Sequence, residues 1–218
     1  MSKVMLASRN VKKLEELRRI LAESAPSVEL VGLDDVPPYP DTVESGATFA
    51  ENALLKAREA AAVSGLPAIA DDSGLAIDAL NGMPGVLSAR WAGRAKSDSN
   101  NLRLVLDQVS DVPDERLTAA FVCAAALVLP SGDERVVEGR MEGHLVREPR
   151  GTKGFGYDPI FEPTGSPRTT AEMDPPEKDA ISHRGKAFRA LARILSDTPL
   201  TTLSDARSLP RSGRCDQS

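Results

Sequence analysis

The stretch LTAAFVCAAALVLPSGDERVVEGRMEGHLV, residues 117–146, decides whether the middle of this chain is helical or extended. Its apolar first part, residues 117–129, has a composition that also fits a buried helix. The turn residues PSGDE and the second run after them favour strands, because turn residues between two such runs are typical of a hairpin. The sequence therefore predicts a long β-hairpin.

Strand-like and helix-like segments alternate before this hairpin. A short strand is predicted at residues 4–7, and Asn10 can cap a helix that carries Leu14, Leu17 and Leu21 on one stripe. The proline-rich, acidic stretch DDVPPYPDTVE that comes later is typical of a loop. This order predicts a strand, a tight turn and a helix start near the N-terminus.

A second helix has clear start and stop signals. Thr48 and Glu51 have capping-box spacing, and Gly65 and Pro67 end the helical pattern. Strands are then expected at residues 68–70 and 75–80, on either side of a DDSG turn, and a third helix at residues 100–109.

The last helix is predicted to begin near Ser182 and to bury Phe188, Leu191 and Leu195. Beyond it, residues 196–218 are rich in Ser, Asp, Arg and Pro and lack apolar periodicity, so we expect a disordered tail with no catalytic role. The alternating elements predict a single α/β domain over residues 1–195.

Composition excludes several classes of protein. The 218 residues carry a net charge of −5, which gives no long-range field to attract nucleic acid or an anionic membrane. No run approaches the ~20 apolar residues of a membrane span, and the N-terminus lacks a signal-peptide pattern, so the cytoplasm is the expected compartment. Cys123 and Cys215 have neither metal-site spacing nor the context of a disulfide.

Two stretches are candidates for holding phosphate and metal. In SRNVKK, Ser8 to Lys13, free backbone N–H groups at a helix start favour a phosphate, although simple capping by Asn10 explains the same residues. Glu44, Asp71 and Asp72 form an acidic set whose repulsion a divalent cation would offset. A structural turn capped by its own side chains is the equal alternative.

Two further stretches are candidates for holding a base. In GTKGFGYDP the glycines let backbone approach a ligand, and Phe155 and Tyr157 offer faces for a purine, unless both rings belong to the core. The stretch does not fit the dinucleotide-binding glycine pattern. In EKDAISHRGKA, Lys178, His183 and Arg184 are donors suited to clamping a base or phosphate, although a basic helix start usually just faces water.

Together these blocks resemble the inosine triphosphate pyrophosphatase family, also called the HAM1-like or non-canonical purine NTP pyrophosphatases. The resemblance rests on ASRNVKKLEEL, TFAENALLKAREAA, AIADDSGLAIDALNGMPGVLSARWAG, GTKGFGYDPIF and EKDAISHRGKA. It implies an elongated mixed sheet flanked by helices, with two lobes enclosing a nucleotide cleft. It also implies a magnesium-dependent hydrolase, usually a homodimer, that cleanses the nucleotide pool by converting ITP, dITP and XTP to monophosphate and pyrophosphate.

The resemblance assigns roles to residues of this chain. Asp72 is the implied catalytic residue, and Glu44 with Asp72 the implied metal ligands. The first turn reads Ser8-Arg9-Asn10, where the family usually has Thr-Gly-Asn or Thr-Ser-Asn. The implied substrate-binding residues are Ser8, Arg9, Asn10, Lys13, Ser73, Phe155, Gly156, Tyr157, Asp158, Lys178, His183 and Arg184.

Two alternatives are left open by the sequence. A Maf-like nucleotide pyrophosphatase resembles this pattern in its N-terminal turn and acidic residues, but the SHR and FGYD blocks argue against it. A non-catalytic nucleotide-binding protein would use the acidic set as a structural turn.

Overall fold

The structure is a computed structural model that describes residues 2–8, 10–26 and 28–197. Its centre is a seven-stranded mixed sheet in the order β2-β1-β3-β5-β6-β7, with β4 paired to β3. β1 pairs in parallel with β2 and β3, and the other pairs are antiparallel. The strands are β1 Ser2–Leu6, β2 Val28–Val31, β3 Ala68–Ile77, β4 Met83–Pro84, β5 Thr118–Val128, β6 Glu134–Leu145 and β7 Phe161–Pro163.

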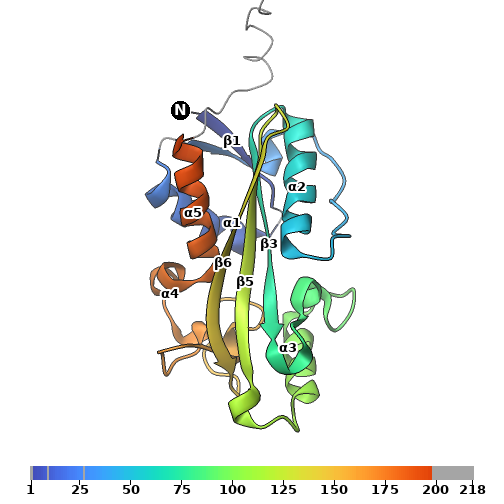
Figure 1. The fold of residues 1–218 in the computed structure, drawn as a ribbon, viewed down its shortest axis with the longest axis vertical. Helices are drawn as coiled ribbons and strands as arrows, with labels where there is room; N and C mark the ends of the chain where they lie inside the picture. Colours follow the sequence, from blue (N-terminus) through green and yellow to red (C-terminus); the bar gives the residue numbers. More distant parts are fainter. Residues whose placement is uncertain (1, 9, 27, 198–218) are drawn as a thin grey trace, which may run out of the picture.

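Five α-helices are described: α1 Val11–Ser24, α2 Phe49–Ser64, α3 Asp98–Gln108, α4 Pro175–Ile181 and α5 His183–Asp197. Figure 1 shows α1 and α5 on one side of the sheet and α2 on the other. In the same view α3 lies toward the end of the molecule that is away from β1. None of the helices described is long and apolar enough to cross a membrane. The predicted mixed α/β architecture with flanking helices is confirmed.

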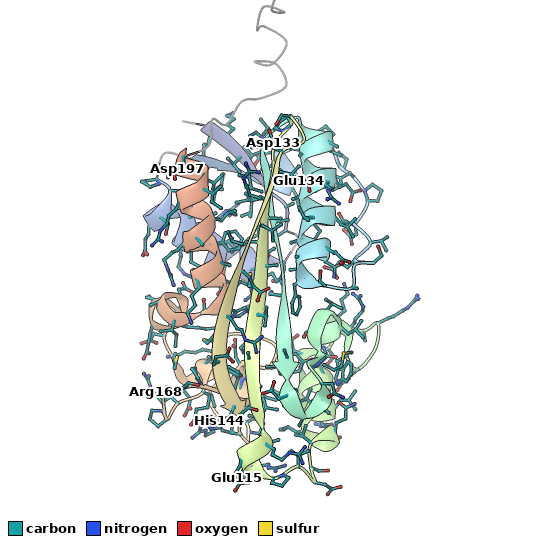
Figure 2. All side chains as sticks on the ribbon, viewed as in Figure 1. Glu115, Asp133, Glu134, His144, Arg168 and Asp197 are labelled. Carbon is teal, nitrogen blue, oxygen red and sulfur yellow. The ribbon has the colours of Figure 1, made fainter. Side chains whose placement is uncertain are left out.

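The predicted hairpin is the longest feature of the molecule. β5 and β6 pair from Thr118 opposite His144 to Val128 opposite Glu134. Figure 2 places Asp133 and Glu134 near one end of the molecule and Glu115 at the other, so the hairpin spans most of its length. Residues 118–128 form a strand and not the alternative helix. β5 lies between β3 and β6 and is buried on both faces, so its sequence is continuously apolar and shows no polar alternation.

Three apolar clusters cover this sheet. Alternate residues of β1 face opposite sides, so Leu6 packs with α1 and α5 while Met5 packs with α2. Alanines of α2, including Ala53 and Ala57, let that helix lie close to β3 and β5. The third cluster lies further along the sheet and includes Val105 of α3. The core is therefore divided by the sheet and along its length.

The helix starts follow the local capping signals. Asn10 caps α1 by accepting the Lys13 backbone N–H at 3.2 Å, and Thr48 caps α2 by accepting the Glu51 N–H at 3.1 Å. The Glu51 carboxylate accepts the Ala47 N–H at 2.8 Å rather than that of Thr48, so the capping box is displaced by one residue. These caps fix where both helices begin beside the cleft described below.

The prediction of a turn at DDSG is wrong. β3 runs unbroken from Ala68 to Ile77, and its residues pair with β5 throughout, with Asp71 opposite Ala125 and Asp72 opposite Ala124. An extended partner strand satisfies the backbone of these residues, and nearby cations compensate the carboxylates, so no turn is needed. Residues 78–80, also expected in a strand, form a 3₁₀ turn.

The last three helices differ slightly from expectation. α3 begins at Asp98, earlier than predicted, because the Ser97 side chain accepts the Asn100 N–H at 3.3 Å. α4 is a separate short helix that the sequence did not predict, and Lys178 lies on it rather than at the start of α5. α5 continues through Ser196 and Asp197, and the rest of the expected tail, residues 198–218, lies outside the described residues.

Candidate active site

A cleft of about 380 Å³ collects the residues that the sequence singled out. It lies where the β1–α1 turn, the middle of β3, α2 and the start of α5 meet the glycine-rich segment 151–157. Arg9, an expected phosphate contact, lies outside the described residues. The other expected residues all line the cleft: Ser8, Asn10, Lys13, Glu44, Asp72, Ser73, Phe155, Gly156, Tyr157, Asp158, Lys178, His183 and Arg184.

Two adjacent carboxylates of β3 leave the strand on opposite faces. Asp71 faces α1 and α5, where it accepts the Lys13 ammonium at 3.0 Å and lies 3.5 Å from the Arg184 Nε. Asp72 faces α2. The alternation of side chains along a strand therefore separates two like charges that the sequence places side by side.

The Asp71 carboxylate is a buried anchor for cations. Burial alone would raise its pKa, but the charges of Lys13, Arg184 and Lys56 outweigh burial and hold the pKa well below its usual range. The Ser73 hydroxyl also donates to it, at 3.3 Å. Asp71 is thus ionised, and it orients the lysine expected to meet the phosphates.

The Asp72 carboxylate has a different environment. Its Oδ2 accepts the Asn52 amide at 3.0 Å, and its Oδ1 accepts the Lys56 ammonium at 3.3 Å. Burial raises the pKa of Asp72, and the attraction of Lys56 and Lys13 only partly opposes this, while Glu44 raises it further. Of the two neighbouring aspartates, Asp72 is therefore the better proton acceptor near neutral pH.

Glu44 reaches the same cation from the loop before α2. Its carboxylate accepts Lys56 at 3.0 Å and the Arg90 guanidinium at 3.1 Å, and Arg90 also donates to its backbone oxygen at 3.3 Å. Burial would raise the pKa of Glu44, but these cations, Lys56 above all, lower it. Desolvation would lower the pKa of the half-buried Lys56, but Asp72, Asp71 and Glu44 together hold it above its usual value.

This donor set fits a magnesium ion. The carboxylates of Glu44 and Asp72 both lie within 3.3 Å of the Lys56 ammonium nitrogen. Their oxygens therefore point toward one common position, called the cation position below, where a small cation could bind both. Among the residues described, no three His, Cys, Asp or Glu side chains form a complete metal cage. Magnesium needs only one or two carboxylates, because waters and substrate phosphates complete its octahedral shell.

The glycine-rich segment forms the opposite end of the cleft. The Phe155 ring lies 5.4 Å from the Lys178 ammonium and 5.0 Å from the Arg184 guanidinium. Tyr157, by contrast, is only 4% exposed and donates its hydroxyl to the Ser88 backbone oxygen at 2.8 Å. One ring therefore lies under the cations of the cleft, and the other belongs largely to the core.

Asp158 holds this segment in shape. Its carboxylate accepts the Phe155 N–H at 2.8 Å, the Lys178 ammonium at 2.6 Å and the Thr170 hydroxyl at 2.7 Å. Gly156 has a φ of +63° and donates its N–H to Asp98 of α3 at 2.9 Å. Glycine suits this left-handed conformation, which other residues adopt only with strain.

The start of α5 supplies two buried side chains. His183 stacks on Phe121, with ring centroids 4.9 Å apart, and its Nδ1 has no hydrogen-bond partner among the described residues. Burial and the neighbouring Arg184 and Lys178 hold the pKa of His183 well below its usual value, so the ring is neutral. Arg184 donates to Glu16 at 3.0 Å and to Ser73 at 2.8 Å, which fixes the guanidinium across the cleft.

The sequence did not indicate four residues of the site, which are Glu16, Asn52, Lys56 and Arg90. Asn52 and Lys56 are four residues apart on α2, so they share the face of the helix that meets Asp72. A polar pair at this spacing on a face otherwise built of alanines was the available signal. Glu16 and Arg90 gave none, because only the fold brings them to Arg184 and Glu44.

Comparison with known proteins assigns this chain to a family. Residues 4–194 match the Ham1 family. A dITP/XTP pyrophosphatase of Streptomyces coelicolor is 57% identical, covering 90% of this chain and 98% of its own. One from Mycobacteroides abscessus is 60% identical, covering 88% of this chain and 94% of its own.

Solved structures agree with the sequence match. The crystal structure of a nucleoside-triphosphatase / dITP/XTP pyrophosphatase from Mycobacterium abscessus is 60% identical, with a TM-score of 0.73 over 87% of this chain and 98% of that one. A HAM1 protein from Coxiella burnetii is 42% identical, with a TM-score of 0.81 over 91% of this chain and 100% of that one. The match covers nearly all of the described residues, so this chain belongs to the Ham1 family.

Proposed function

We propose that this chain is a pyrophosphohydrolase that converts the non-canonical purine nucleotides ITP, dITP and XTP to the monophosphate and pyrophosphate. The observation that carries the proposal is the cleft, which has cations and carboxylates at one end and an aromatic ring with buried donors at the other. Relatives at 57% and 60% identity are dITP/XTP pyrophosphatases, which favours this activity over that of a Maf-like enzyme.

The triphosphate binds at the end formed by β1, α1 and β3. Ser8, Asn10 and the first turn of α1 offer a hydroxyl, an amide and free backbone N–H groups to phosphate oxygens. Lys13 and Lys56 supply positive charge from two sides of the carboxylates. This arrangement supports a pose with the phosphates next to Asp72 and the base toward Phe155.

Magnesium is the cofactor we propose, held by Glu44 and Asp72. When bound with substrate, it would neutralise charge on the phosphate oxygens as the leaving group develops. The convergence of both carboxylates on Lys56 supports this assignment.

Asp72 orients the attacking water and accepts its proton. The water oxygen forms a bond to the α-phosphorus, the bond from that phosphorus to the α,β-bridging oxygen breaks, and pyrophosphate leaves with the bonding electrons. The raised pKa of Asp72 supports the role of proton acceptor. Lys13 and the N–H groups of the α1 start stabilise the departing pyrophosphate.

Selection among purines depends on the 6-position of the base. Hypoxanthine and xanthine carry a keto oxygen there, which accepts hydrogen bonds, whereas adenine carries an amino group, which donates them. Arg184 and Lys178 are obligate donors beside the Phe155 ring, so they favour the keto form. A buried donor left unpaired by adenine costs about 1–3 kcal/mol.

Product analysis with a panel of substrates tests the proposal. Inosine triphosphate should give pyrophosphate without orthophosphate, with turnover that depends on magnesium. Inosine and xanthosine triphosphates should react much faster than adenosine triphosphate, and guanosine triphosphate, which shares the 6-keto oxygen, measures the separate effect of the 2-amino group. Equal rates across the panel would contradict the selectivity, and the absence of any product would favour a non-catalytic nucleotide-binding protein.

Two properties are not addressed by this chain's cleft: the oligomeric state, for which the family resemblance implies a homodimer, and the compartment, which is expected from the sequence to be the cytoplasm. We propose a homodimer located in the cytoplasm. Light scattering coupled to size-exclusion chromatography measures the first, and fractionation of cells that express the protein measures the second.

A further inference from the structure

One buried amide links the two elements that carry Asp72 and Glu44. Asn52 lies in α2 with a side chain that is 0% exposed. Its Nδ2 donates to the Asp72 Oδ2 at 3.0 Å, and its Oδ1 accepts the Gly46 N–H at 2.8 Å. Both ends of the amide are therefore occupied, one by the central strand and the other by the loop that carries Glu44.

The loop end of this link depends on a close approach. Gly46 is two residues after Glu44, in a segment without regular secondary structure. A Cβ added to Gly46 would lie 2.6 Å from the Glu51 Cβ and 2.8 Å from the Asn52 Oδ1, both closer than real Cβ contacts. The absence of a side chain thus lets the Gly46 backbone reach the start of α2.

The orientation of the amide is fixed by what it contacts. Reversing it would set the Asn52 oxygen against the Asp72 carboxylate and its NH₂ group against the Gly46 N–H, two repulsive contacts. In the observed orientation the amide occupies the Asp72 Oδ2, which leaves the Oδ1 facing Lys56. Asn52 therefore determines which carboxylate oxygen is directed toward the cation position.

We propose that Asn52 is a positioning residue that sets the relative geometry of Asp72 and Glu44. This inference rests on the proposed function, because it matters to catalysis only if these carboxylates hold the metal and activate water. Lys56, one helical turn further along α2, contacts the same two carboxylates as a charge. Asn52 instead joins Asp72 to the loop of Glu44 through two hydrogen bonds of a neutral amide. These bonds do not depend on which cation occupies the cation position.

Replacing the amide tests the role in turnover. Asn52→Ala should lower kcat for inosine triphosphate about 10²-fold with little change in KM, since a misplaced group costs rate rather than substrate affinity. Leu195→Ala is the matched control, because it also removes a buried side chain but lies at the far end of α5. The control should lose thermal stability and keep its kcat.

Two further variants separate the two hydrogen bonds. Asn52→Asp keeps an acceptor for the Gly46 N–H but sets a second carboxylate against Asp72. Its kcat should therefore be reduced, as in Asn52→Ala. Gly46→Ala keeps both groups of the Asn52–Asp72 bond, while its added Cβ, which would lie 2.8 Å from the Asn52 Oδ1, pushes the loop and the amide apart. Its main effect should be on metal binding through Glu44.

Metal binding gives a measurement that does not depend on turnover. Mn²⁺ affinity, measured by electron paramagnetic resonance in the complex with an α,β-imido analogue of inosine triphosphate, should fall about 10- to 100-fold in Asn52→Ala and Gly46→Ala, as is usual when the partner of a metal ligand is lost. Leu195→Ala should bind Mn²⁺ as the wild type does.

Three results would overturn the proposal: a near-normal kcat in Asn52→Ala, full activity in Asn52→Asp, or unchanged Mn²⁺ affinity in Asn52→Ala and Gly46→Ala. Failure of the proposed function is distinguishable from these, because the wild-type protein would then release no pyrophosphate from inosine triphosphate.

Discussion

Asp71 and Asp72 are adjacent in the sequence and differ in chemistry. Asp71 meets cations from α1 and α5, which hold its pKa well below the usual range despite burial. Asp72 meets a neutral amide and one ammonium, and burial raises its pKa. Strand alternation sends them to different neighbours, so one residue orients Lys13, the proposed phosphate-binding lysine, and the other remains for the proposed reaction.

Asp72→Asn should remove activity and preserve the fold. Asparagine keeps an acceptor for the Asn52 amide, but it can neither take a proton from water nor hold a metal as a carboxylate does. We expect kcat to fall about 10²–10⁴-fold, the range for loss of a general base. Steady-state kinetics and circular dichroism check this, and a variant with near-normal turnover would contradict the role of Asp72.

Asp71→Asn should instead damage stability. The change leaves Lys13 and Arg184 facing a buried neutral group, and removing one partner of a buried ion pair costs about 3–5 kcal/mol. Urea unfolding measures the difference, with Asp72→Asn as the matched control at the next residue. If both variants unfold at the same urea concentration, the assignment of Asp71 as the structural carboxylate fails.

At the scale of elements, the position of α5 on the sheet places His183 and Arg184. The helix start lies directly over β6 at Gly139, where an added Cβ would lie 2.1 Å from the His183 backbone oxygen and 2.6 Å from the Ala187 nitrogen. Neither backbone atom can move without the helix. The end of the cleft proposed to hold the base therefore depends on a contact between two elements that are distant in sequence.

Gly139→Ala should push α5 off the sheet and weaken substrate binding. Overpacking of this kind costs about 1–3 kcal/mol of stability, and the shift of Arg184 should raise KM for inosine triphosphate. Gly32→Ala is the control, because a Cβ there would meet its nearest atom at 3.6 Å, an ordinary contact. An unchanged KM in Gly139→Ala would mean that α5 does not set the position of the base clamp.

At the scale of the whole molecule, the cleft joins parts with separate cores. The phosphate end is carried by β1, α1 and α2, which pack in the first two clusters, while Tyr157 of the base end packs in the third. β3 and β5 run through all three clusters. Their long pairing keeps the two ends of the proposed nucleotide site in register.

Acid should destabilise the fold through His183. Its folded-state pKa is lowered by burial and by Arg184 and Lys178, with Asp71 as the main opposing charge, so below the unfolded value of about 6.5 the unfolded chain binds more protons. The free energy of unfolding should then fall with decreasing pH, by up to about 1.4 kcal/mol per pH unit from this group. The slope is absent well above pH 6.5.

Unfolding curves measured from pH 7.5 to pH 5 test this prediction. His183→Gln should reduce the slope, because glutamine does not titrate. Leu195→Ala, which removes a buried apolar side chain from the same helix, should lower the stability and leave the slope as it is, because neither residue titrates. A wild-type slope retained in His183→Gln would show that this histidine is not the group that titrates.

Much of this protein is determined by signals that act within a few residues. Asn10 and Thr48 cap their helices in the structure as the sequence predicts, because a cap needs only its own first turn. The turn residues around Gly132 likewise predict the hairpin. The motif blocks together were enough to predict the family and the residues that line the cleft.

Only the tertiary structure decided how those residues pair. Asp71 lies in a strand rather than a turn because Ala125, far along the chain, pairs with it. Asn52, Lys56 and Arg90 join the carboxylates through packing of α2 and the segment before α3 against the sheet. Local sequence specifies caps and turns, whereas desolvation and charge depend on neighbours that only the folded chain supplies.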